Sequence, residues 1–83
     1  MQVPTHLHLS LFCLVRFQVW TREGRAWVEG AKDDIDLDYE NVQELIDLGL
    51  AVEGETRVRC GAGAQAAFNE TFSDRNIPSH PGL

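Results

Sequence analysis

A run in which apolar side chains occupy every second position places the strongest constraint on the fold of this chain. The odd positions from 7 to 19 are all apolar, namely Leu7, Leu9, Leu11, Cys13, Val15, Phe17 and Val19. A period of two is typical of a β-strand with one buried face. Phe12 and Leu14 add apolar side chains at even positions, so we expect the second face to be partly covered. The pattern predicts one long N-terminal strand.

The next residues predict a β-hairpin followed by a third short strand. Residues 21–25 form a polar turn that contains Gly24, and residues 26–29 are typical of the returning strand. After a second turn that begins at Gly30, residues 35–37 alternate again between apolar and polar side chains. We therefore expect three strands before the first helix.

One helix is specified at both of its ends. Asp38 is suited to the N-cap position, and the helix is expected to run from about Tyr39 to Leu48. Gly49 follows in the position where a left-handed residue ends a helix, and Leu50 can then pack back on Leu45. Residues 50–53 predict a closing strand, and residues 56–59 predict a weaker edge strand.

Chain length and composition limit the domain organisation. A chain of 83 residues is one small domain with a modest core. Residues 1–14 are expected to form an extended N-terminal strand or arm, and residues 15–59 a small β domain. Residues 60–83 begin with small side chains, and two prolines and a glycine interrupt their last six residues. They therefore predict a C-terminal arm that a partner orders.

The charge balance argues against nucleic acid as a partner. Seven Lys and Arg stand against thirteen Asp and Glu, which gives a net charge of -6 and a pI near 4.8. This is the wrong sign for a protein that binds a phosphate backbone. The longest apolar stretch, residues 7–15, is also much shorter than the roughly 20 residues of a membrane span. We therefore expect neither nucleic acid nor a membrane as partner.

No residue pattern predicts a metal site, a cofactor or a catalytic centre. Three aspartates imitate the start of a calcium-binding loop: Asp34, Asp36 and Asp38. Tyr39 and Leu45 stand where that loop needs glycine and glutamate. Nor does any closely spaced Cys or His pair complete a zinc site. Cys13 and Cys60 are expected to be free thiols. Because no catalytic residue pattern is found, the chain is interpreted as non-enzymatic.

Aromatic side chains are the candidates for partner binding. Trp20 and Trp27 flank the hairpin together with Arg16, Arg22 and Arg25, the residue types that dominate binding hot spots. A simpler interpretation makes the two tryptophans a structural cross-strand pair. The predicted contact anchors are Phe12, Trp20, Trp27, Phe68, Phe72 and Ile77.

The region from Val15 to Glu53 resembles small virion proteins of tailed bacteriophages. The resemblance rests on apolar and glycine positions: Val15, Phe17, Gly24, Trp27, Gly30, Ile35, Leu37, Val42, Leu45, Ile46, Gly49, Leu50 and Ala51. The chain departs from that pattern in the acidic residues 31–34, in its long N-terminal strand and in its C-terminal arm. The resemblance implies a mainly β, α+β fold with one short helix, namely a small SH3-like β-barrel with an extended N-terminal strand and a C-terminal arm.

The same resemblance implies a structural role in the virion after synthesis in the host cytoplasm. The leading expectation is a capsid decoration, or cement, protein that stabilises the major-capsid lattice through its arms. Its partners would be the major capsid protein and neighbouring copies of itself. Two alternatives stay open: a head-tail connector or neck protein, and a soluble SH3-like adaptor that binds a peptide near Trp20 and Trp27.

Overall fold

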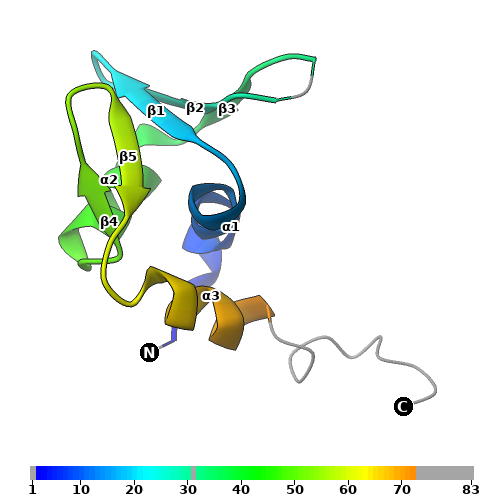
Figure 1. The fold of residues 1–83 in the computed structure, drawn as a ribbon, viewed down its shortest axis with the longest axis vertical. Coiled ribbons are helices and arrows are strands. Elements are labelled where there is room, and N and C mark those ends of the chain that lie inside the picture. Colours follow the sequence, from blue (N-terminus) through cyan, green and yellow to red (C-terminus); the bar gives the residue numbers. More distant parts are fainter. Residues whose placement is uncertain (1, 31, 73–83) are drawn as a thin grey trace.

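The computed structural model describes residues 2–30 and 32–72, which form an α+β domain with α-helices and an antiparallel sheet (Figure 1). The elements of this part of the chain are, in order, a 3-10 helix η1 (Thr5–Leu7), α1 (His8–Arg16), β1 (Val19–Arg22), β2 (Arg25–Val28), β3 (Ile35–Leu37), α2 (Tyr39–Asp47), β4 (Ala51–Glu53), β5 (Arg57–Cys60) and α3 (Ala64–Phe72). The helix expected near residues 39–48 is therefore one of three α-helices in the described chain.

The five strands form an open sheet, so the expected closed SH3-like barrel is wrong. Their order is β3-β2-β1-β5-β4, and every neighbouring pair is antiparallel. Closure would require β3 and β4 to pair with each other, but they are the two edges. β5, expected at an edge, lies inside the sheet. The strands have only three or four residues each, and the long strand that would have extended the sheet is absent from its expected place.

The expected N-terminal strand is instead the helix α1. Leu7, Leu11 and Leu14 are 0%, 0% and 5% exposed, and their spacing of four and three residues is that of one helix face. By contrast, Leu9 is 62% exposed although a strand would bury it. Of the two apolar residues at even positions, which looked like a second covered strand face, Leu14 belongs to this stripe and Phe12 contacts phenylalanines of α3. The N-terminal segment is thus part of the core and does not form an extended arm.

The core lies between α1, α2 and one face of the sheet. The largest fully buried side chains come from all three layers: Leu7, Leu11, Leu45, Val19 and Val28. Figure 1 shows α1 beneath the bent sheet, with α3 on the side of α1 away from the sheet. Since these helices share one side, the opposite face of the sheet has no described element packed over it.

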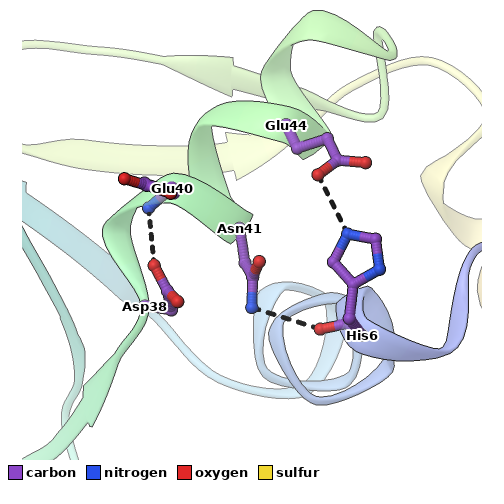
Figure 2. A network of polar contacts seen from close by, with 5 residues as sticks. All are labelled: His6, Asp38, Glu40, Asn41 and Glu44. Atoms are coloured by element: carbon purple, nitrogen blue, oxygen red, sulfur yellow. Dashed lines mark hydrogen bonds and ion pairs between the residues drawn. The ribbon is translucent and has the colours of Figure 1, made fainter.

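Both ends of α2 agree with the sequence prediction. The Asp38 side chain accepts a hydrogen bond from the Glu40 N–H at 2.9 Å (Figure 2). At the other end Gly49 has φ of +80°, and the Leu50 N–H donates to the Leu45 carbonyl at 3.0 Å. This is the expected left-handed cap. The helix ends at Asp47, one residue before the expected end.

Polar contacts attach the N-terminal segment to α2. The Asn41 side chain donates to the His6 carbonyl at 3.1 Å, and His6 Nε2 lies 2.9 Å from Glu44 Oε1 (Figure 2). Both side chains of the His6–Glu44 pair are about half exposed, so the contact contributes little to stability by itself. Together these contacts orient η1 along α2.

The expected C-terminal arm begins with an ordered helix. α3 packs against α1 through Ala64 and Ala67, which are 0% and 2% exposed. Gly61, just before α3, lies close to the backbone of residues 49–51, and its N–H donates to the Leu50 carbonyl at 2.8 Å. A Cβ atom on Gly61 would lie 2.7 Å from the Gly49 carbonyl oxygen, so glycine is required there. The part of the predicted arm beyond Phe72 lies outside the described residues.

The helical N-terminus predicts opposite effects for two neighbouring leucines. We expect Leu11→Ala to lower the free energy of unfolding by about 2–5 kcal/mol, because it leaves a cavity in the core. Leu9→Ala removes an exposed side chain and should change stability by no more than about 0.5 kcal/mol. Urea unfolding followed by circular dichroism measures both. Similar large losses for both variants would contradict the helix, since a strand buries both leucines.

Candidate functional site

The open face of the sheet gathers the tryptophans and most arginines of the chain. Inward-facing strand residues such as Val19, Val28 and Val58 are buried against the helices. The alternate residues face the other way because side chains along a strand alternate between faces. We call this surface the tryptophan–arginine face, and it consists of Trp20, Arg22, Arg25, Trp27, Arg57 and Arg59.

A continuous row of side chains crosses four strands of this face. Trp20 on β1 is the register partner of Trp27 on β2 and of Arg57 on β5. Trp27 is in turn the partner of Asp36 on β3. Direct cross-strand partners have Cβ atoms about 5 Å apart. The two tryptophans are therefore neighbours on adjacent strands near the centre of the sheet, with charged residues on both flanks.

The ring of Trp27 is turned outward and already holds a planar cation. The Arg25 guanidinium carbon lies 5.6 Å from the Trp27 ring centroid, within the range of a cation–π contact. The same guanidinium lies 3.6 Å from a carboxylate oxygen of Asp36, and both side chains are largely exposed. Arg25 is thus held weakly enough to exchange this contact for one with a partner.

Two nitrogen atoms at the centre of the face have no hydrogen-bond acceptor in the described chain. They are Trp20 Nε1 and Arg57 Nε, both buried from solvent. Their residues are register partners on adjacent strands. An unsatisfied buried donor costs about 1–3 kcal/mol.

Positive charge is concentrated on this face of an acidic chain. The four arginines of the face and Asp36, which lies beside Trp27 on the same side of the sheet, have a combined charge of +3. Since the net charge of the chain is -6, the rest of the sequence carries -9. Val52 is the remaining outward residue and is 56% exposed. The face therefore combines cations with apolar surface and has the opposite sign to the remainder of the chain.

The predicted contact anchors divide into two groups. Trp20 and Trp27 lie on the tryptophan–arginine face, as the hairpin prediction implied. Phe12, Phe68 and Phe72 meet instead between α1 and α3, and Ile77 lies outside the described residues. The structure thus brings together three phenylalanines that had been assigned to two separate arms.

The phenylalanines form what we call the Phe12 cluster, made of Phe12, Phe17, Phe68 and Phe72. The ring of Phe12 lies 6.2, 5.9 and 5.6 Å from those of Phe17, Phe68 and Phe72. These distances are typical of favourable aromatic pairs. Phe17 is 51% exposed, so the cluster joins α3 to α1 and also presents apolar surface to solvent.

Arg57 and Arg59 are site residues that were not among the predicted contact anchors. Their strand was predicted, but at an edge of the sheet. The strand order, which places β5 next to β1, was the missing information. Only this order brings Arg57 beside Trp20.

The two free thiols lie in different surroundings, one buried and one exposed. Cys13 is buried in the core, and burial raises the pKa of its thiol, which disfavours the reactive thiolate. The Cys60 Sγ donates to the Leu14 carbonyl at 3.5 Å. Among residues 2–30 and 32–72 no group of three His, Cys, Asp or Glu side chains is arranged to hold a metal ion. The tryptophan–arginine face therefore remains the strongest candidate site in this part of the chain.

The helices in the described ranges are too short or too polar to cross a membrane. Comparison with family models, with curated proteins and with solved structures finds no match to this chain. The tryptophan–arginine face is thus the feature of the described chain that most directly indicates a function.

Proposed function

We propose that this chain is a non-enzymatic binding protein whose open sheet face takes up an anionic macromolecule. The segregation of charge carries this proposal, because a face of +3 lies on a chain with a net charge of -6. Arginine is suited to carboxylate and phosphate groups because its planar guanidinium donates two parallel hydrogen bonds. The two tryptophans add apolar contact area at the centre.

The acidic side chains of α2 do not cancel the attraction at this face. Exposed charges more than about 8 Å apart are largely screened at physiological ionic strength. A partner on the tryptophan–arginine face meets four arginines directly, whereas the acidic side chains of α2 lie on the opposite side of the sheet. The net charge of the whole chain is thus a poor guide to the charge that a partner meets at this face.

Two copies of the face are poorly suited to each other. Direct stacking of one face on a second copy would bring the arginines of both sheets together, and like charges in an interface cost several kcal/mol. The natural occupant is therefore negatively charged. Charge repulsion thus favours the binding of a different molecule over a face-to-face dimer.

Retention on immobilised heparin, a polyanion, tests the proposal. We expect the full chain to bind heparin at low salt in spite of its net negative charge, and to elute as salt is raised. Arg22→Ala should elute at lower salt, because it removes one cation from the face. Arg16→Ala is the matched control, since Arg16 is an exposed arginine of α1 outside the face.

The two arginine variants have the same net charge, so only the location of the lost cation differs. Equal elution of both variants would show that the face has no special role. Failure of the unaltered chain to bind at low salt would contradict the proposed function.

A second candidate is the virion structural role implied by the resemblance to tailed-phage proteins. The observation that favours it is the Phe12 cluster, an exposed apolar surface between α1 and α3 that is distinct from the sheet face. A subunit of a shell contacts neighbours on more than one side, and repeated weak contacts add up to firm attachment. The partners would be a capsid protein and further copies of the chain.

Sedimentation with purified phage heads tests this second candidate. We expect the full chain to pellet with heads and Phe17→Ser to pellet less, because Phe17 is the exposed edge of the cluster. Leu48→Ser, which removes an exposed leucine at the end of α2, is the matched control. A copy number that scales with the shell subunits indicates decoration, and a single ring of copies indicates a connector. No sedimentation of the full chain would contradict the virion role.

A further inference from the structure

We infer that the anionic macromolecule is a single-stranded nucleic acid whose bases stack on Trp20 and Trp27 while the surrounding arginines hold its phosphates. This inference rests on the proposed function and names the partner of the same face. It goes against the expectation drawn from net charge. That expectation treated the charge of the chain as uniform, whereas the fold places four of its seven basic residues on one face.

The distribution of side chains on the face matches the two parts of a nucleotide. The aromatic rings occupy the central strands β1 and β2, and arginines lie beyond them at the hairpin end and on β5. Proteins that bind single strands combine aromatic platforms for bases with basic groups that follow the backbone. Open sheets with helices on the other face are one established platform for this recognition, and they stack two or three bases.

The contact between Arg25 and Trp27 shows that the stacking position is accessible. A guanidinium already lies over the Trp27 ring at 5.6 Å, so a planar group reaches that ring from outside. A base that takes this position would displace Arg25. The released side chain, which is largely exposed, could then pair with a phosphate. Binding would therefore replace one cation–π contact by a base stack and a charged hydrogen bond.

The size of the platform fits a short single-stranded segment. The row from Asp36 to Arg57 crosses four strands, and neighbouring strands are about 4.8 Å apart, so the row spans roughly 14 Å. This length accommodates two or three stacked bases.

A single strand fits this face better than a duplex or an acidic protein. In a duplex the bases are stacked on each other and do not offer their faces to an open sheet. Carboxylates of an acidic protein would pair with the arginines but leave the two rings without planar partners. A single strand contacts the arginines through its phosphates and the tryptophan rings through its bases at the same time.

Tryptophan fluorescence reports on this face alone, because both tryptophans of the chain lie on it. The probe is a 12-nucleotide oligothymidylate added to the full chain at low salt. We expect quenching of tryptophan fluorescence on binding. If four phosphates are neutralised, log K should fall with log salt with a slope of about -3. Poly-L-glutamate serves as a polyanion without bases, and it should bind more weakly and leave the fluorescence nearly unchanged.

Trp27→Leu tests the stacking directly. We expect it to weaken oligothymidylate binding by about 5- to 150-fold, the equivalent of one lost base stack, as measured by anisotropy of a labelled oligonucleotide. Trp27 is preferred to Trp20 because the indole nitrogen of Trp20 is buried in the fold. Leu9→Ala is the control: it removes an exposed apolar side chain of α1 outside the face and should bind normally. Circular dichroism confirms folding, and Trp27→Phe replaces Trp27→Leu if the latter unfolds.

The outcomes separate this inference from the proposed function. Binding of poly-L-glutamate without binding of oligothymidylate would overturn the nucleic-acid partner and leave an anion-binding face. Oligothymidylate binding that neither quenches fluorescence nor responds to Trp27→Leu would overturn base stacking. Loss of binding to both probes and to heparin would overturn the inference and the proposed function together.

Discussion

The burial of α1 against one face of the sheet is the contact on which the rest of the structure depends. Leu7 and Leu11 are 0% exposed and touch a core that also contains residues of α2 and the strands. Because η1, α1 and α2 supply enough apolar surface to cover this face, the sheet does not need to close on itself. α3 then packs on the outer side of α1. The opposite face of the sheet is left open.

This one-sided arrangement determines where the charged and aromatic groups meet. Strand alternation directs Val19 and Val28 inward and Trp20 and Trp27 outward, and the order of the strands adds Arg57 beside Trp20. An acidic chain thereby obtains a basic and aromatic surface. The binding proposals follow from this surface, whereas the Phe12 cluster offers a separate apolar contact on α1 and α3.

Local signals were predictable from the sequence and long-range placement was not. Asp38 and Gly49 mark the ends of α2 through hydrogen bonds within a few residues, so those predictions are confirmed. The apolar residues of 7–19 contain both the alternation of a strand and, at Leu7, Leu11 and Leu14, the spacing of a helix. Burial distinguishes the two, through an exposed Leu9 and a buried Ser10. The tryptophan pair was visible in the hairpin. Arg57 joined it only through the position of β5, which no local pattern specifies.

The most direct test of this account is a map of amide chemical-shift changes when the 15N-labelled full chain is titrated with oligothymidylate. The account predicts that the largest changes fall on β1, β2 and β5 around Trp20, Trp27 and Arg57, with small changes on α1 and α3. Changes centred on the Phe12 cluster, or spread without relation to the sheet, would contradict the central claim that the open face is the binding surface.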